Sequence, residues 1–345
     1  MKKSTRLAAV LFAVFTLTSH SHAQSPLVTI DTVTVGDAGN AADTVVMDDS
    51  TTGYGSVGYE FAIGKYEVTI GQYNTFLNSV ASVTSASYIV NLWNASMTDN
   101  LNIAGISRSG SGTLGDPYSY SVIGSDNRPI TYVSWFDAAR FANWVNNGAT
   151  LGASTETGAY TLNGATSGIF TLNPGATWFL PSEDQWYKAA YYKGGGTNAG
   201  YWVYPTQSDS GPGNFISGFA NQANYNNGVY AVTQSADYSS TQNYLTDAGV
   251  LSNSASAYGT FDQGGNVWEW NDAVIGFGSG RGLRGGSWDY NVSLLQSSFR
   301  YAGDPTNGNN VVGFRVASVP EPSTYALILM AGAGWLLWKR RKIRL

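Results

Sequence analysis

Residues 264–290 read "GGNVWEWNDAVIGFGSGRGLRGGSWDY", a stretch rich in glycine and tryptophan with few charged side chains. A tryptophan brings a large apolar area and one N–H group that a polar interior can satisfy. We therefore expect the tryptophans of this stretch, and those of similar motifs elsewhere, to be core residues rather than parts of a cofactor site. The full set is Trp135, Trp144, Trp186, Trp268, Trp270 and Trp288.

Charged residues next to these motifs have structural interpretations as well. Arg284 in "RGGS" and Arg315 in "GFRV" are predicted to hold loops through bidentate hydrogen bonds to main chain or carboxylate. Glu183 and Asp184 are expected to open a helix, where the helix dipole favours negative charge. A catalytic carboxylate pair is the less favoured interpretation of these two residues.

The N-terminus has the features of an export signal. Lys2, Lys3 and Arg6 precede an apolar run over residues 7–17, and Ser21 and Ala23 supply small side chains at the cleavage positions. We expect residues 1–23 to be a signal peptide that signal peptidase removes. An uncleaved anchor is disfavoured because the apolar run is too short for a bilayer of about 30 Å.

The C-terminus has three parts: a proline-rich break at residues 319–322, an apolar segment at 325–338 and a basic end. This tail resembles the PEP-CTERM sorting signal of Gram-negative bacteria, which an exosortase recognises. The resemblance implies secretion across the inner membrane, transient anchoring through the short transmembrane helix 325–338, and release to the cell surface or extracellular matrix. A simple tail anchor is the alternative. The residues that carry the resemblance are Pro320, Glu321, Pro322, Arg340 and Arg341.

The composition excludes several kinds of chemistry. The chain has no cysteine, and its two histidines, His20 and His22, lie in the predicted signal peptide. Triads with histidine, cysteine nucleophiles and the usual copper, iron and zinc sites need an imidazole or a thiol. We expect none of these metals in the mature chain, and no disulfides.

The predicted exported domain, residues 24–318, is acidic. The predicted signal and tail hold three and five of the 18 basic residues, and the tail holds one of the 23 acidic residues, which leaves a formal charge of −12. Nucleic acid is therefore not expected as a partner, whereas divalent cations are plausible ligands.

Cap signals predict three helices, and short β-branched or aromatic runs predict strands. Three hydroxyl residues are each followed, three positions later, by a side chain that completes a capping box: Thr69 by Gln72, Ser134 by Asp137 and Ser182 by Gln185. The second and third helices are expected to stop at Gly148 and Gly194. Predicted strands are "YEFAIGKYEVT" (59–69), "TWFLP" (177–181), "VYAVTQ" (229–234) and "GFRVAS" (313–318). Residues 195–265 lack periodicity, so aromatic packing or bound cations must hold them.

Six motifs in order resemble the formylglycine-generating enzyme (sulfatase-modifying factor) family. They are "IGKYEVTIGQYNTFLN" (63–78), "RPITYVSWFDAARFANW" (128–144), "FLPSEDQWYKAA" (179–190), "GNVWEW" (265–270), "RGGSW" (284–288) and "GFRVA" (313–317). The resemblance implies a single α+β domain over residues 24–318, with the irregular C-type-lectin-like fold of that family and little regular secondary structure.

The family's chemistry is not carried over in full. The enzymes of the family use a pair of cysteines to bind copper, and the matching positions here are Tyr290 and Leu295. Oxidative formylglycine generation is therefore not expected. The resemblance implies a structural Ca²⁺ site at Asp262, Gly265, Val267 and Glu269, and a second near Asn224, Tyr225 and Asp237. The alternative for Glu269 is a buried carboxylate paired with Arg284, Arg300 or Arg315.

These observations predict an exported surface or matrix protein with a catalytically silent domain that binds exopolysaccharide or another surface component. Exposed aromatic and amide side chains would stack on sugar rings and hydrogen-bond to them. The candidate ligand-binding residues are Tyr201, Trp202, Tyr204, Tyr225 and Tyr230. The alternatives are a hydrolase using Glu269, Asp272 and Asp289, and a self-associating structural matrix protein.

Overall fold

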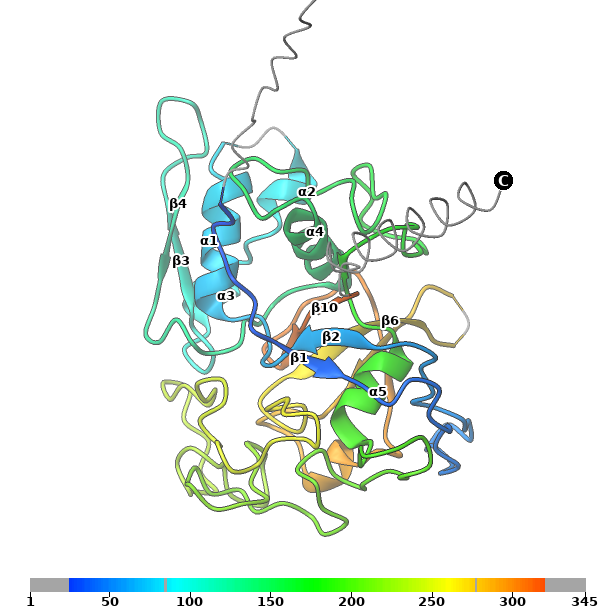
Figure 1. Ribbon diagram of the computed structural model, residues 1–345. Coiled ribbons are helices and arrows are strands. Elements are labelled where there is room, and N and C mark those ends of the chain that lie inside the picture. The colour runs from blue at the N-terminus through cyan, green and yellow to red at the C-terminus, as the bar shows by residue number, and fades with distance from the viewer. Residues whose placement is uncertain (1–24, 84–85, 277, 320–345) are drawn as a thin grey trace, which may run out of the picture.

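The computed structural model of the chain describes residues 25–83, 86–276 and 278–319 (Figure 1). The predicted signal peptide, the sorting residues from Pro320 onward and the predicted membrane helix 325–338 lie outside the described residues. Within the described ranges, no helix is long and apolar enough to cross a membrane.

One antiparallel sheet joins the beginning and the end of the described chain. Its strand order is β1 (Thr32–Val35), β2 (Phe61–Gly64), β10 (Ala317–Ser318) and β5 (Trp178–Phe179). β2 forms the centre, with Ile63 opposite both Val33 of β1 and Ala317 of β10. The buried apolar residues Phe61, Ile63 and Phe179 attach this sheet to the core.

A second four-stranded sheet contains the stretch 264–290. Its order is β8 (Tyr301–Gly303), β7 (Arg281–Arg284), β6 (Trp268–Val274) and β9 (Val312–Phe314). β6 and β9 are parallel and the other pairs are antiparallel. The register places Trp268 beside Val312 and Leu283 opposite Tyr301. A separate hairpin is formed by β3 (Ile106–Ser109) and β4 (Ser119–Val122).

The three predicted helices are confirmed as α1 (Ile70–Val80), α4 (Trp135–Asn146) and α5 (Glu183–Tyr191), each with its complete capping box. α5 ends three residues before the predicted stop Gly194, because Tyr192 is already extended at ψ 136°. Short turns of helix follow at α2 (Ser87–Val90), α3 (Ser96–Asp99) and the 3-10 helix η1 (Val292–Leu295).

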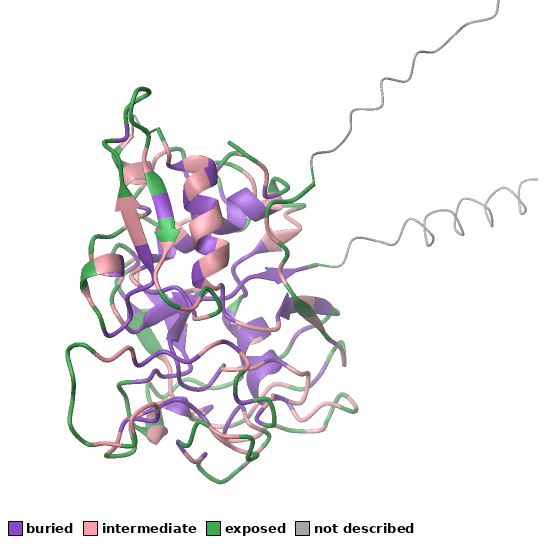
Figure 2. Cartoon of the chain, turned by 90° about the vertical axis from the view of Figure 1, so that its left-hand side faces the viewer, coloured by how far each residue is buried: buried purple, intermediate pink, exposed green. Residues whose placement is uncertain are grey.

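The tryptophans are core residues, as predicted. All six are at most 5% exposed, and most of the indole N–H groups find an acceptor, for example Val133 O for Trp270 at 3.0 Å. Figure 2 shows buried residues in helices, strands and many of the inner loops, with the exposed residues mainly in the outer loops. The interior of this fold therefore combines aliphatic residues with many large aromatic side chains.

The predicted strand 229–234 is wrong. Gln234 adopts a positive φ of 51°, and its N–H donates to Tyr230 O at 2.8 Å, so the segment turns back on itself. The aromatic residue that suggested a strand serves packing instead, because Tyr230 lies against Tyr244 with ring centroids 4.5 Å apart. The other three predicted strands each contain an observed strand.

Residues 195–265 contain only isolated bridges, yet they are fixed in place. Aromatic packing contributes, as expected: the Tyr244 ring lies parallel to Trp288 at a centroid distance of 4.9 Å. Side-chain amides contribute as much. Asn214 and Asn224 donate to the carbonyls of Val229 and Tyr244, each at 2.9 Å. The amides replace the backbone ladder that these residues lack.

Candidate functional site

An aromatic groove of about 230 Å³ crosses the second sheet. All four strands of the sheet, or the loops adjoining them, contribute to it, together with the turn after "RGGSW". The aromatic groove is lined by Trp268, Leu283, Tyr290, Leu294, Phe299, Tyr301, Asn309, Val311 and Val312.

Trp268 forms the floor of the aromatic groove. It is 5% exposed and has three aromatic neighbours, whose ring centroids lie 5.9 Å (Tyr290), 5.8 Å (Phe299) and 6.2 Å (Tyr301) from its own. Tyr290 and Tyr301 are 42% and 56% exposed, so large parts of both rings face solvent. A buried indole flanked by exposed phenol rings gives an apolar surface with hydroxyl groups at its edge.

Buried ion pairs fix the wall of the aromatic groove. Arg284, which is fully buried, donates to the carbonyls of Ser297 and Phe299 at 3.0 and 2.9 Å. Its guanidinium also bonds Glu183 at 2.8 Å, at the start of α5. Arg300 binds the same carboxylate. The loop prediction for Arg284 and the helix-opening prediction for Glu183 are thus confirmed in one network.

The groove is uncharged. None of the residues that line it in the described chain carries a formal charge, and its polar groups are phenol hydroxyls and the exposed Asn309 amide. Such a surface suits a neutral ligand with both apolar faces and hydroxyl groups.

The two positions that match the family's cysteines have different environments here. Tyr290 lines the aromatic groove and is partly exposed. Leu295 is fully buried among Tyr204, Ala223 and Tyr225. One position therefore faces the groove and the other fills the interior.

The predicted ligand-binding tyrosines are mostly interior. Tyr204, Tyr225 and Tyr230 are 5%, 1% and 9% exposed, so their rings pack against the protein and cannot offer a face to a sugar. For these three residues the prediction is corrected. Tyr201 and Trp202 are partly exposed but belong to a different region, where Lys193 lies over the Trp202 ring at 4.2 Å.

Glu269 is an ion-pair residue. Both its oxygens accept hydrogen bonds of 2.6 Å from Arg315, and Oε2 also accepts from Trp186 Nε1 at 2.7 Å. Both charged side chains are fully buried. Of the alternatives for Glu269, pairing with Arg315 is confirmed. The Glu269 carboxylate does not fit the role of a calcium ligand in this arrangement, because Arg315 already neutralises it.

Two further carboxylates lie near this pair. Burial raises the pKa of Asp262 to about 6, against the lowering effect of a hydrogen bond from Gly249 N–H and of Arg315. Burial also raises the pKa of Glu67 well above its ordinary value, and Asp262 and Glu269 add to this rise. Glu67 Oε2 has no hydrogen-bond partner among the described residues.

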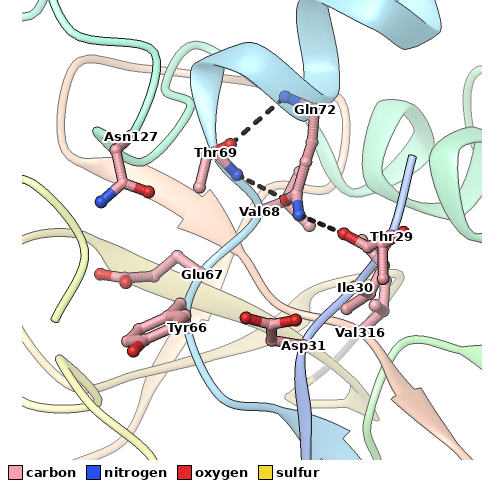
Figure 3. Close-up of a pocket in the computed structure, with 10 residues that line it drawn as sticks. All are labelled: Thr29, Ile30, Asp31, Tyr66, Glu67, Val68, Thr69, Gln72, Asn127 and Val316. Carbon is pink, nitrogen blue, oxygen red and sulfur yellow. Dashed lines mark hydrogen bonds between the residues drawn. The ribbon is translucent and has the colours of Figure 1, made fainter. Parts of the chain in front are cut away.

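Glu67 also lines a small polar cavity of about 160 Å³. Figure 3 shows Glu67, Asp31 and Asn127 around it, on three separate segments, beside the capping box of Thr69 and Gln72. In residues 25–83, 86–276 and 278–319, no three His, Cys, Asp or Glu side chains form a group that could hold a metal ion. Any cation here would depend largely on main-chain and amide oxygens.

The residues of the second predicted calcium site, Asn224 and Asp237, lie in different environments. Asn224 is buried, and its amide bonds Tyr244 O and Asn266 Oδ1 at 2.9 and 3.1 Å. Asp237 is exposed. Among the described residues no hydrogen bond joins the two side chains, so their shared ligation stays a prediction from the resemblance.

The carboxylates of the hydrolase alternative are not free. Glu269 is bonded to Arg315, and Asp272 pairs with Arg281 at 2.9 Å, while Asp289 lies at the surface. Glu269 is fully buried, Asp272 is only 17% exposed, and each is held by an arginine, so they cannot serve as the acid and base of a shared open cleft. This arrangement argues against the hydrolase interpretation.

Sequence motifs indicate only a core role for Trp268 and a lost cysteine position at Tyr290; the other lining residues of the aromatic groove, among them Phe299, Tyr301 and Asn309, were missed. Phe299, Tyr301 and Asn309 lie between the motifs "RGGSW" (284–288) and "GFRVA" (313–317), in a segment without an obvious pattern. The alternation "FRYAG" at 299–303 was the available signal, because Phe299 and Tyr301 then share one face of a strand.

Comparison with known proteins places the chain in a family. A model of the sulfatase-modifying factor enzyme 1-like domain matches residues 29–319, so the chain belongs to that family. The PEP-CTERM protein-sorting motif matches residues 318–342 and marks an exported, cell-envelope-directed protein that exosortase-type machinery processes. No curated protein sequence matches the chain.

Of three solved structures that resemble the chain, the first two show the same fold. The crystal structure of CarF is 22% identical with a TM-score of 0.50, and covers 85% of this chain and 99% of its own. Treponema denticola variable protein 1 is 19% identical with a TM-score of 0.50, covering 84% and 95%. PvdO from Pseudomonas aeruginosa is 17% identical with a TM-score of 0.43, covering 84% and 92%.

Proposed function

We propose that this exported protein binds neutral polysaccharide at the aromatic groove and that its domain is catalytically silent. The observation that carries the proposal is the cluster of Trp268, Tyr290, Phe299 and Tyr301, with Tyr290 at a position where the family's enzymes have a copper-binding cysteine. Residues 24–345 contain no thiol and no imidazole to replace that chemistry.

The chemistry of the groove supports sugar as the ligand. Pyranose rings have apolar C–H faces that pack on aromatic rings, and hydroxyl groups that exchange hydrogen bonds with amides and phenols. The formal charge of −12 on residues 24–318 disfavours acidic polymers by repulsion. A neutral glycan therefore fits both the lining and the overall charge.

The first prediction concerns Tyr301. We expect Tyr301→Ala to weaken binding of a neutral polysaccharide at least tenfold, equivalent to about 1.4 kcal/mol, because it removes one of the exposed stacking faces. Tyr290→Ala should act in the same direction. Affinity gel electrophoresis of the full chain against neutral and acidic polysaccharides measures the effect.

Phe219→Ala is the matched control, because Phe219 is 71% exposed and lies outside the groove. Its affinity should equal that of the unchanged protein. If neutral polymers bind equally well to the Tyr290 and Tyr301 variants, the groove is not the site. If no neutral polymer in the panel binds the unchanged protein, the proposed function fails.

We also propose a structural calcium site with fewer ligands than the family resemblance implies. Because Glu269 is bonded to Arg315, the candidate ligands are the Asp262 carboxylate and the main-chain oxygens of Gly265 and Val267. Gly265, at φ 85°, supports it: a Cβ there would lie 2.4 Å from Asn224 O, so only glycine allows this close turn.

The second prediction is a pH effect at Asp262. Because its pKa rises on folding from 3.8 to about 6, the folded state binds this proton more tightly, and its contribution to stability is lost as pH rises through about 6. When the pH is raised from 4 to 7, the free energy of unfolding should therefore fall more in the unchanged protein than in Asp262→Asn. The difference between the two falls should be on the order of 2 kcal/mol. Urea unfolding at several pH values in chelator measures it.

Calcium should reverse this behaviour if it binds at Asp262. A cation favours the ionised carboxylate, so millimolar Ca²⁺ would raise the melting temperature of the unchanged protein most above pH 6 and that of Asp262→Asn much less. Equal melting curves with calcium and with chelator at pH 7 would remove the calcium proposal and leave the sugar-binding proposal intact.

A further inference from the structure

A second cavity, here named the polar pocket, lies beside the aromatic groove. Its volume of about 500 Å³ exceeds that of the groove and falls within the usual range for small-molecule sites. It is bounded by α2 and the loop after it, the first turns of α4, and the loops at 166–167 and 306–308. Gly308 lines the polar pocket and the next residue, Asn309, lines the aromatic groove, so the two cavities are neighbours across one loop.

The base of the polar pocket is rigid. At the start of α4, Ser134 and Asp137 exchange hydrogen bonds of 2.9 and 3.1 Å in the capping box. Arg140, which is 1% exposed, bonds Glu156 at 2.8 and 3.2 Å and Ala165 O at 2.8 Å. Its guanidinium lies 4.9 Å from the centre of the Tyr88 ring and so supports that ring from one side.

One wall of the pocket holds a strained residue. Tyr132 has a φ of 58°, a conformation that bulky side chains rarely adopt. Its N–H donates to Asn309 O at 2.9 Å, and its hydroxyl accepts from Asn100 Nδ2 at 2.9 Å. Gly308 packs so closely that a Cβ would lie 2.5 Å from the Tyr132 carbonyl carbon. Strain held by this many contacts is typical of functional sites.

The pocket offers hydrogen bonds but little net charge. The positive charge of Arg140 is matched by Glu156, and the Asp137 carboxylate is already bonded to Ser134. Asn91 is exposed on the rim, and among the described residues its amide has no side-chain hydrogen bond. Tyr88 and Tyr132 add partly exposed aromatic rings, whereas Phe136 is 2% exposed and only closes the pocket from the interior. Amides, hydroxyls, one carboxylate and aromatic faces together match a neutral sugar.

We infer that the polar pocket is a second carbohydrate-binding site, which holds another part of the same neutral polymer that occupies the aromatic groove. The inference rests on the proposed function for its ligand class but on different residues for its site. Two sites on one chain raise the affinity for a long polymer beyond that of either site alone.

The inference can be tested with a substitution that places a bulky side chain at the rim of the polar pocket. Ser167 is exposed and lines the pocket, so Ser167→Trp blocks it without disturbing the core, and Asn91→Ala removes one polar contact. Thr171→Trp is the matched control, because it adds the same bulk at an exposed residue that does not line the pocket. Equal melting temperatures establish that all three variants of the full chain are folded.

With a long neutral galactomannan or β-glucan, we expect Ser167→Trp to weaken binding about tenfold and Thr171→Trp to leave it unchanged. Long-polymer binding by Ser167→Trp and Asn91→Ala at the level of the unchanged protein would overturn the inference while leaving the groove proposal standing.

Saturation-transfer NMR in the Tyr301→Ala background separates the two sites. Neutral oligosaccharides such as cellohexaose and mannohexaose should still give a signal there, because the pocket is intact, and adding Ser167→Trp should remove it. If Tyr301→Ala gives no signal, or if the signal persists after Ser167→Trp is added, the inference that the polar pocket binds sugar is wrong. This conclusion does not depend on whether the aromatic groove binds sugar.

Discussion

Glu269→Gln lowers the free energy of unfolding by about 3 kcal/mol, because it leaves the fully buried Arg315 without its carboxylate. The loss is at the lower end for a buried pair, since Arg315 keeps its hydrogen bonds to Gly64 O and Phe261 O at 2.9 Å. Arg315→Met should cost about 5 kcal/mol, because Glu67, Asp262 and Glu269 then lose their shared cation. Urea unfolding monitored by tryptophan fluorescence gives both values.

Asp247→Asn is the control for this prediction. The pair of Asp247 with Arg128 spans 3.9 Å, and the side chains are 46% and 26% exposed, so its loss should change stability by less than about 0.5 kcal/mol. A cost below about 1 kcal/mol for Glu269→Gln would contradict a stabilising role for the buried pair of Glu269 and Arg315.

Glu183→Gln should also destabilise the protein by about 3 kcal/mol. Its carboxylate serves two guanidinium groups, and Arg284 has no other carboxylate partner among the described salt bridges. Because Arg284 also holds the carbonyls of Ser297 and Phe299, loosening of this network should weaken sugar binding at the aromatic groove as well. Unfolding curves and affinity electrophoresis on the same variant measure the two effects.

Asp184→Asn provides a contrast from the neighbouring residue. Burial raises the pKa of the Asp184 carboxyl, so its charged form is disfavoured in the fold, and its main contact is acceptance from Gly55 N–H at 2.8 Å. Asparagine keeps that acceptor, so the expected cost is below about 1 kcal/mol. Equal costs for the two substitutions would show that the helix dipole, rather than the arginine network, determines the role of Glu183.

Local features of this fold could be predicted from sequence, whereas the groove could not. The capping boxes at Thr69, Ser134 and Ser182 depend on residues three positions apart, and all three formed as expected. The aromatic groove depends on the parallel pairing of β6 with β9, which brings Trp268 beside Val312, and on the antiparallel pairing of β7 with β8, which places Tyr301 opposite Leu283. No local pattern encodes these registers, so Tyr301 and Asn309 could not be assigned to the site of Trp268.

The misplaced tyrosines show a related limit. Tyr204 and Tyr225 stand in a polar, glycine-rich context that suggests surface loops, yet both rings are buried against Leu295. Asparagine side chains close hydrogen bonds over that region and allow loops to enclose aromatic residues. Composition indicated an irregular segment, but burial depended on contacts between residues far apart in the chain.

The position of β10 has a consequence for the order of events during biogenesis. Ala317 and Ser318 pair with both β2 and β5, so the first sheet lacks a strand between its two halves until residue 318 is available. The sorting motif begins at that same residue. A chain that crosses the membrane from its N-terminus can therefore complete its first sheet only as its sorting tail begins to emerge. A chain that terminates before residue 317 would lack both β10 and the tail, so we expect such products to be left incompletely folded and open to proteolysis.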